Sequence, residues 1–310
     1  MSSAASQIQT GDIVPVNLPL TDPEWPAFGR KQFEHSILTL VPNIAYDDTY
    51  NMNTQSGTQF DGFRHFSHIP TGQFYNGTTG EDIVGDKANT HKCSIHHWAE
   101  HGIAGRGVLI DYWGYAKKNG KEYDPYSYHA IGFDDLFAAG KDQGIDIRPA
   151  AQGGDIQIGD LLFIRSGFVE TYYSKEPEER KKLGLRKHGL GDVETEFAGV
   201  GQEDKVLDWL HDSYFAAVVG DAPSFEAWPP KTGKSSNNNR ERITCVDRRQ
   251  IITSINTFWH SGECRWVRCS TWKSFQRRVE KRRDGSSSSP LLQPMYQVCQ
   301  TSAIKVEQAC

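Results

Sequence analysis

TQSGTQFDGFRHFSHIPTGQFY, residues 54–75, is the stretch of this sequence that is richest in side chains able to bind metal ions or move protons. Gln55, Gln59, Asp61, His65 and His68 recur there at short intervals around two glycines. Residues two or four positions apart on an extended segment project to the same face. Their oxygen and nitrogen atoms are therefore able to surround one hard or borderline metal ion, and we predict that this stretch forms the floor of an active site.

Residues 55–65 read QSGTQFDGFRH, which resembles the pattern H-x-G-T-H-x-D-x-P-x-H of the cyclase family of metal-dependent hydrolases. This family includes bacterial kynurenine formamidases and isatin hydrolases. The residues that match the pattern are Gly57, Thr58, Asp61 and His65. Glutamine replaces its first two histidines and Phe63 replaces its proline, as in a divergent, fungal-type member. The resemblance implies an α/β fold, the cyclase-type swivelling β/β/α domain with a mixed sheet, over roughly residues 13–230 and usually in homo-oligomers.

The resemblance also implies roles for individual residues, because in the family the first two histidines and the aspartate bind metal while the last histidine moves the proton. Carried onto this sequence, the metal ligands are Gln55, Gln59 and Asp61. The catalytic residue is His65. The residues expected beside the ligands or against the substrate are His68, Phe63 and Tyr75. The implied substrate is a small aryl amide, such as N-formylkynurenine in tryptophan catabolism, or a lactam.

The chemistry of these side chains supports the roles and also limits them. A carboxylate at Asp61, flanked by aromatic residues, is costly to bury unless a cation compensates its charge; the alternative is a hydrogen bond to the adjacent turn. Gln55 and Gln59 offer only neutral amide oxygens, which bind zinc more weakly than imidazole does. We therefore expect a divalent ion, manganese or zinc, whose binding is weakened or absent, with a preference shifted toward harder ions such as manganese or magnesium.

The two histidines of the stretch have distinct expected roles. An imidazole titrates near neutrality, so His65 is suited to take a proton from water and return it to a leaving nitrogen; the alternative is a structural histidine. His68 is placed to orient Asp61 or His65. The aromatic residues of the stretch either line an apolar pocket for an aryl substrate or pack into the core. These are Phe60, Phe63, Phe66 and Tyr75.

A second hypothesis keeps the fold without the catalysis. The two glutamines favour a metal-poor relative that binds a small molecule or a partner. Other kinds of site have little support. His97 and His101 are four residues apart on an expected helix, a spacing that lets two histidines share a metal. No third ligand accompanies them, and the alternative is that they lie on a solvated face of the helix. The sequence has no P-loop, dinucleotide fingerprint or G-x-S-x-G elbow.

The rest of the chain alternates between expected strands and helices, which is typical of an α/β domain. Residues 1–35 form an N-terminal arm rich in turn residues, in which Trp25 and Phe28 either cap a pocket or anchor the arm. The α/β domain covers residues 36–230. Its expected strands are 36–41, 108–110, 161–164 and 215–220, and its expected helices are 93–100, 133–139 and 201–209. We expect loops around 46–48 and 72–80, a solvated excursion at 171–190, and Asp111 facing the site from a strand end.

Charge and cysteine content divide the chain at about residue 230. Residues 231–310 contain 15 Lys and Arg against 6 Asp and Glu, whereas residues 1–230 contain 19 against 33. Cys93 stands alone in the acidic part, and the other five cysteines follow residue 230. One thiol in a body of this size suits a reducing compartment, and neither a secretory signal nor 18 consecutive apolar residues is present. We expect a soluble cytoplasmic protein that binds neither nucleic acid nor membranes.

Residues 231–310 have no clear periodicity and fit few strand or helix patterns. The resemblance implies that this region supplies a helix with a histidine and, further on, a glutamate that complete the metal site, and neither appears in context. Our hypothesis is that the tail arises from an unspliced intron and a frame shift; its alternative is a basic, disordered extension that binds nucleic acid or membrane phosphates. A transcript that codes continuously through Lys231 in the present frame excludes the first hypothesis.

Overall fold

Five strands form the central sheet of the structure, a computed structural model that describes residues 5–8, 10–68, 71–188, 194–229 and 266–268. The sheet order is β3-β9-β8-β6-β4. The bounds are β3 Phe60–Asp61, β4 Gly107–Ile110, β6 Leu161–Ile164, β8 Ala217–Gly220 and β9 Trp266–Arg268. The last four strands in chain order are mutually parallel, whereas β3 pairs with β9 in the antiparallel direction. The sheet is therefore mixed, as expected.

The inner strands are apolar because both faces of the sheet are covered. β6 reads LLFI and is buried at all four positions. Leu162 and Ile164 contact one apolar cluster, while Leu161 and Phe163 contact the other. This alternation follows from the two-residue period of a strand, and a parallel sheet covered on both faces has no polar side. The strands predicted at 108–110, 161–164 and 215–220 are confirmed, the last beginning two residues later than expected.

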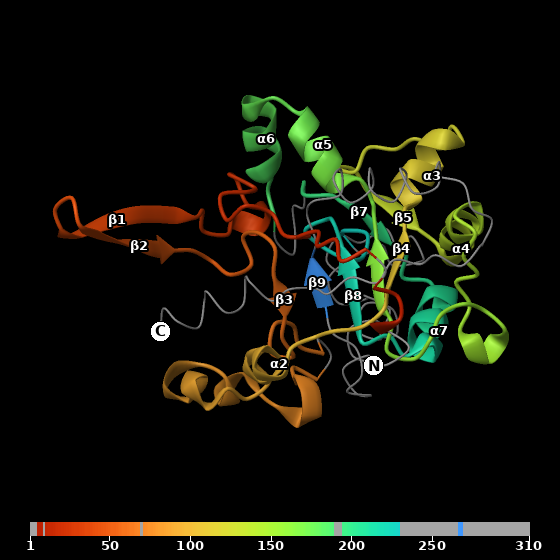
Figure 1. Cartoon of the computed structure of the whole chain (residues 1–310), viewed down its shortest axis with the longest axis horizontal. Helices are drawn as coiled ribbons and strands as arrows, with labels where there is room; N and C mark the ends of the chain where they lie inside the picture. Colours follow the sequence, from red (N-terminus) through yellow and green to blue (C-terminus); the bar gives the residue numbers. More distant parts are fainter. Residues whose placement is uncertain (1–4, 9, 69–70, 189–193, 230–265, 269–310) are drawn as a thin grey trace, which may run out of the picture.

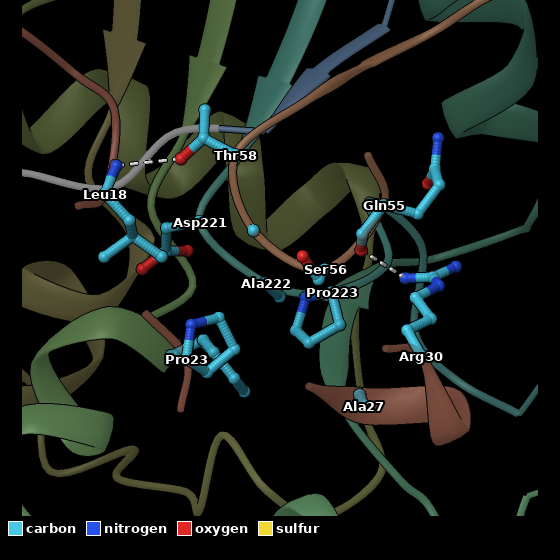
Figure 2. A pocket seen from close by; sticks show the side chains of 12 residues that line it. Leu18, Pro23, Ala27, Arg30, Gln55, Ser56, Thr58, Asp221, Ala222 and Pro223 are labelled. Carbon is cyan, nitrogen blue, oxygen red and sulfur yellow. Dashed lines mark hydrogen bonds between the residues drawn. The ribbon is translucent and has the colours of Figure 1, made fainter. Parts of the chain in front are cut away.

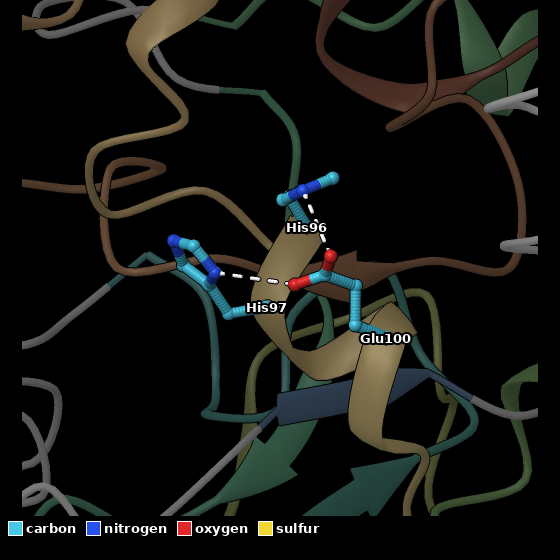
Figure 3. Close-up of side chains that lie close together, drawn as sticks. All are labelled: His96, His97 and Glu100. Carbon is cyan, nitrogen blue, oxygen red and sulfur yellow. Dashed lines mark ion pairs between the residues drawn. The ribbon is translucent and has the colours of Figure 1, made fainter.

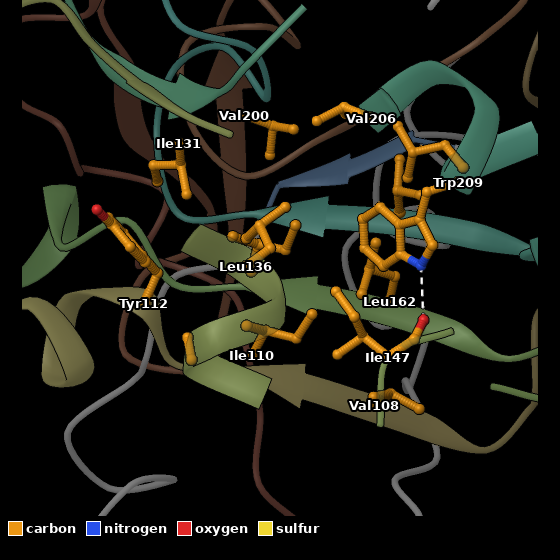
Figure 4. Close-up of a cluster of buried hydrophobic side chains, with 14 of the residues drawn as sticks. Val108, Ile110, Tyr112, Ile131, Leu136, Ile147, Leu162, Val200, Val206 and Trp209 are labelled. Atoms are coloured by element: carbon orange, nitrogen blue, oxygen red, sulfur yellow. Dashed lines mark hydrogen bonds between the residues drawn. The ribbon is translucent and has the colours of Figure 1, made fainter. Parts of the chain in front are cut away.

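Three helices cover one face of the sheet. They are α3 Tyr112–Lys118, α4 Phe133–Asp142 and α7 Asp204–Ser213. Figure 4 shows their apolar side chains packed against Val108, Ile110 and Leu162 of the strands. Trp209 of α7 is 4% exposed, and its indole Nε1 donates to the carbonyl oxygen of Ile147 at 2.6 Å. Since each fully buried large apolar side chain stabilises a fold by about 1.5–3 kcal/mol, this cluster is a principal source of stability.

The second apolar cluster lies on the other face of the sheet, beneath α5 Phe168–Ser174 and the N-terminal arm. Phe28 of the arm lies edge-on to Phe197 and Trp228, with ring centroids 5.9 Å and 5.4 Å apart. Phe28 is therefore an anchor of the arm, the second of the two roles considered for it. The next helix, α6 Pro177–Gly184, has no buried residue, as expected for a solvated excursion at 171–190. Tyr172, at the start of that range, is 5% exposed and differs from the expectation.

Two smaller sheets accompany the main one. β5 His129–Ile131 pairs in parallel with β7 Ala198–Val200. β1 Glu34–Val41 and β2 Ala45–Asn51 form an antiparallel hairpin that extends away from the body (Figure 1). The strand expected at 36–41 is confirmed, but the loop expected around 46–48 is wrong, because those residues belong to β2. The homo-oligomer expected from the resemblance stays a prediction.

The helix boundaries differ from the sequence-based ones in informative ways. α2 His96–His101 is shorter than the helix expected at 93–100 and begins three residues later. α4 continues through Gly140, which was expected to end it, since a Cβ at Gly140 would lie 2.4 Å from Ile147. Gly140 is thus required for close packing rather than for a helix stop. The structure also contains short 3-10 helices, namely η1 Ala27–Gly29, η2 Tyr75–Gly77, η3 Gly80–Asp82, η4 Gly85–Thr90 and η5 Ala150–Gln152.

The described residues contain no helix that is both long enough and apolar enough to cross a membrane. Of the basic tail, the structure describes residues 266–268, which form β9 beside β8 and β3. We expected few strand patterns in residues 231–310, and β9 differs from that expectation. The hypotheses on the rest of residues 231–310 lie outside the described residues.

Gly167 offers a test of the packing at the carboxyl end of β6. Its φ is 89°, and a Cβ there would lie 2.4 Å from Trp113. Gly159 has a similar φ of 86°, but a Cβ there meets nothing within 4 Å. Gly159→Ala should lower the free energy of unfolding by about 1–2 kcal/mol, the cost of left-handed backbone. Gly167→Ala should lower the free energy of unfolding, measured with urea, by clearly more than Gly159→Ala does. Equal decreases for the two variants would show that the contact with Trp113 is relieved without strain.

Candidate active site

The predicted metal ligands lie together at the edge strand β3. Gln55 Nε2 donates to Asp61 Oδ1 at 2.8 Å, and Gln59 Nε2 donates to the same oxygen at 3.2 Å. Gln59 Nε2 also donates to Gln55 Oε1. Asp61 is in β3, whose backbone pairs with β9. The structure thus brings the three residues into one hydrogen-bonded cluster, as their spacing predicted.

A buried oxygen of this cluster has no partner. Gln59 is 7% exposed, and its Oε1 is a buried atom without a hydrogen bond in the described part of the chain. Leaving a buried amide oxygen unsatisfied costs roughly 1–3 kcal/mol. Such an atom is a candidate ligand for a cation. His65 completes the group, with Nε2 3.9 Å from Asp61 Oδ1.

The backbone around Gly62 fixes the position of His65. The His65 amide donates to the Gly62 carbonyl at 2.9 Å, and the Arg64 amide donates to the Cys93 carbonyl at 3.1 Å. A Cβ on Gly62 would lie 3.0 Å from the Ile95 side chain, so only glycine fits without displacement. The segment before α2 therefore packs tightly behind the predicted catalytic histidine.

The other predicted site residues lie around this group with different partners. The Phe63 ring stacks on Tyr75 with centroids 4.4 Å apart and meets Trp98 edge-on at 5.0 Å. Both Phe63 and Tyr75 pack against the larger apolar cluster, which is the core-packing alternative. His68 Nδ1 lies 2.7 Å from Thr71 Oγ1, and its backbone amide donates to the Gln73 carbonyl. The substrate and orienting roles of these three residues stay predictions.

A cavity adjoins the cluster, and Figure 2 shows its walls. Residues 55–58 form one wall, residues 221–223 after β8 form another, and the N-terminal arm supplies Leu18, Pro23, Ala27 and Arg30. Two hydrogen bonds hold the arm to the motif: the Leu18 amide donates to Thr58 Oγ1 at 2.8 Å, and Arg30 Nη1 donates to the Gln55 carbonyl at 3.0 Å. The cavity is thus largely apolar, with one cation at its edge.

Asp221 is a buried carboxyl group in the wall of this cavity. It is 3% exposed and accepts hydrogen bonds from the amides of Ser166 and Gly167 at 2.7 and 3.0 Å. Burial raises the pKa of Asp221, and these hydrogen bonds together with the Arg165 charge offset part of that effect. Asp111, at the end of β4, was expected to face the site. It instead accepts from the Gly114 amide at 2.8 Å and from Arg165.

The cluster of Gln55, Gln59 and Asp61 fits an oxygen-preferring divalent ion. Its polar atoms lie about 3 Å from Asp61 Oδ1, which is the spacing of neighbouring ligands around an ion held at about 2.1 Å. Rotating a terminal amide by about 180° exchanges the positions of its nitrogen and oxygen. After this rotation, the amide oxygens of Gln55 and Gln59 take the places that the nitrogens occupy now, and they face one point together with Asp61. Gln59 Oε1, which has no hydrogen bond to a described residue in the present rotamer, is the oxygen that this rotation brings next to Asp61. Carboxylate and amide oxygens suit manganese or magnesium better than zinc.

Sequence reasoning considered Trp25 and Phe28 of the N-terminal arm as a cap over a pocket, but the arm residues that line the cavity are Leu18, Pro23, Ala27 and Arg30. Nothing in the spacing of Pro23 and Arg30 indicates contact with residues 55–58. Arg30 stands two residues after the anchor Phe28, over whose ring its guanidinium lies at 4.9 Å. A cation two residues after an aromatic anchor is the one sequence signal that points to this placement.

The comparisons with known proteins agree with this fold. The model of the family described as "Putative cyclase" matches residues 14–227, and the chain belongs to this cyclase family. A crystal structure described as a novel cyclase is 20% identical, with a TM-score of 0.64 over 90% of this chain and 82% of the other. An isatin hydrolase bound to the product analogue thioisatinate is 11% identical, with a TM-score of 0.50 over 88% and 86%. Isatin hydrolase A from Ralstonia solanacearum is 15% identical, with a TM-score of 0.48 over 87% and 84%.

No curated protein sequence matches the chain. The matched residues nearly coincide with the span of the resemblance seen in the sequence, 13–230. The family and the α/β fold implied by QSGTQFDGFRH are therefore confirmed. The division into arm, domain and tail stays a prediction.

Proposed function

We propose that this protein is a metal-dependent hydrolase of a small aryl amide or lactam, resembling arylformamidase, in the cytoplasm. The observation that carries the proposal is that the side chains of Gln55 and Gln59 both meet Asp61 Oδ1, with His65 Nε2 3.9 Å from the same oxygen. Membership of the cyclase family and a fold shared with an isatin hydrolase support it.

In this proposal the protein side chains divide the chemistry between them. Gln55, Gln59 and Asp61 would hold a divalent ion, which would supply Lewis acidity toward the substrate carbonyl and make water a better nucleophile. His65 Nε2 takes a proton from the attacking water and delivers it to the leaving nitrogen as the carbon–nitrogen bond breaks.

The cavity beside residues 55–58 has a volume of about 40 Å³, so it has room for one edge of an aromatic substrate rather than for the whole molecule. Leu18, Pro23 and Ala27 give it apolar walls suited to a ring. Arg30 at its edge places a positive charge near the carbonyl of Gln55. N-formylkynurenine has both an aryl group and a carboxylate, whereas isatin has only the ring, so we expect the former to be the better substrate.

Direct assay of the two substrates tests this proposal. Purified protein reconstituted with manganese is incubated with N-formylkynurenine or isatin, and product formation is followed by absorbance. We expect hydrolysis of at least one, with N-formylkynurenine preferred. Hydrolysis of neither by protein that holds a stoichiometric ion rejects the enzyme proposal.

A specific observation favours the second candidate, a non-catalytic relative that binds a small molecule. The amide nitrogens of Gln55 and Gln59 both donate to Asp61, and these hydrogen bonds compensate its charge without a metal. Under this alternative, the protein retains no divalent ion on dialysis, and it binds a ligand in the cavity without converting that ligand to a product. Metal analysis of the dialysed protein separates the two candidates.

His65→Gln should retain the bound ion but lower turnover by about 10²–10⁴-fold, because the variant has no group that transfers protons near neutral pH. His35→Gln is the control, since His35 lies on the β1–β2 hairpin and its ring pairs with Asp48. The control should keep turnover within a few-fold of the unmodified protein. Equal loss in both variants, measured as kcat at saturating substrate, contradicts the assignment of proton transfer to His65.

A further inference from the structure

A second group of metal-binding side chains lies on α2, outside the motif. Figure 3 shows His96, His97 and Glu100 converging on the surface of this helix. Their ligand atoms all lie within 4.8 Å of one another. Among the described residues, this is the group of three or more His, Cys, Asp and Glu side chains that comes close enough to share an ion.

Each carboxylate oxygen of Glu100 faces a different imidazole. His96 Nε2 lies 3.5 Å from Oε1, and His97 Nδ1 lies 3.5 Å from Oε2. Ligand atoms held at about 2.0–2.1 Å in a tetrahedron around zinc lie about 3.3 Å apart. Each nitrogen–oxygen distance is therefore close to that of a zinc site. Because the two distances end on different oxygens of Glu100, the side chains must rotate for all three residues to share one ion.

The helix that carries these ligands is held firmly from its other side. Trp98 is 9% exposed and meets Phe63 edge-on, with centroids 5.0 Å apart, so the opposite face of α2 is packed against the motif. His96, His97 and Glu100 are 29%, 64% and 54% exposed, which leaves the cluster accessible to an ion from solution. Ligands on a rigid element lose little entropy when they bind.

The neighbouring histidines have other partners. His101, considered in the sequence as a metal-sharing partner of His97, has Nδ1 2.8 Å from the backbone carbonyl oxygen of His97. The His91 ring stacks on His96 with centroids 3.9 Å apart and adds a further imidazole next to the cluster. The four-residue spacing that matters on this helix is that of His96 and Glu100.

We propose that His96, His97 and Glu100 bind zinc, or a similar divalent transition metal, at the surface of α2. Two imidazole nitrogens and one carboxylate oxygen are a donor set suited to zinc, copper and nickel, unlike the oxygen-rich motif. Water completes the coordination. Binding closes one turn of α2 and so stabilises the helix that packs behind His65. The proposal does not depend on the proposed hydrolysis.

Zinc titration of the full chain, in competition with a chromophoric chelator, tests this site. The variants are His97→Asn and Glu100→Gln, and the matched control is His101→Asn on the same helix. Loss of a direct ligand should weaken zinc at this site by at least about tenfold, because even residues that only orient ligands contribute that much. The His101→Asn control should bind zinc as the unmodified protein does. The cysteines of the chain are present in every variant and cancel in the comparison.

An independent measurement on the unmodified protein covers the case in which a variant fails to fold. Diethyl pyrocarbonate modifies exposed histidines, and mass spectrometry locates the modified rings. Zinc should protect His97 while leaving His35, an exposed histidine of the β1–β2 hairpin, reactive. Equal zinc binding by all variants, or equal modification of His97 with and without zinc, overturns the proposal. In either case His96 and His97 form only surface ion pairs with Glu100.

Discussion

Asp61→Asn is expected to remove the bound ion and lower turnover of the aryl amide by at least about 100-fold. Asp61 is the single carboxylate in the motif cluster, and Gln55 and Gln59 contribute no charge to offset that of a cation. The substituted amide keeps the shape of the side chain but not its charge. Metal content after dialysis and kcat/KM at saturating manganese measure the two effects separately.

Asp82→Asn is the matched control for this loss. Asp82 belongs to η3 in the loop that follows the motif, and its carboxylate accepts from Thr79 and pairs with Lys92 at 3.2 Å. These contacts lower the pKa of Asp82 to about 2, with the Thr79 amide as the largest cause. The control should retain the ion and full turnover. If both variants keep the ion, Asp61 is not a ligand.

Arg165→Leu is expected to lower the free energy of unfolding by about 3 kcal/mol, the lower end of the cost of breaking a buried ion pair. Arg165 follows β6 and is 1% exposed. Its Nη1 lies 3.0 Å from both oxygens of Asp111, and its Nη2 pairs with Glu170. The substitution leaves Asp111 without its cation, while Glu170 keeps Lys117 at 2.9 Å. Urea unfolding followed by tryptophan fluorescence measures the change.

Arg148→Leu serves as the control, because Arg148 also pairs with an aspartate but on the surface. Its Nη2 lies 2.8 Å from Asp146 Oδ2, and its side chain is 45% exposed. Solvent already screens this pair, so the free energy of unfolding should hardly change. Similar unfolding midpoints for the two variants contradict a stabilising role for the buried network of Arg165.

The elements that the sequence predicted well are those whose burial is uniform. β4, β6 and β8 are short apolar runs, and a strand covered on both faces needs no other pattern. β2 was missed because AYDDTYN projects into solvent on both faces and carries Asp47 and Asp48. α3 was missed because it begins directly at Tyr112, after Asp111 caps it, without an intervening loop. No local periodicity separates such a helix from the strand before it.

The sequence predicted the part of the candidate site that comes from one short segment, and not the part that comes from distant segments. Gln55, Gln59 and Asp61 are near neighbours in sequence, so their meeting in space depends on a few backbone angles. Arg30 and Asp221 reach the same cavity from segments that are distant in the sequence. The pairing of His96 with Glu100 was overlooked in favour of His97 and His101, because spacing alone does not show that His101 turns back to a backbone carbonyl.

The most direct test of the central claim is the rate of aryl amide hydrolysis by metal-free protein before and after manganese is added. Unmodified protein and Asp61→Asn are treated in parallel. The arrangement of Gln55, Gln59, Asp61 and His65 predicts that manganese restores hydrolysis to the unmodified protein and not to the variant. Hydrolysis that is restored equally in both, or that never required the ion, would contradict the claim that this cluster is a metal-dependent active site.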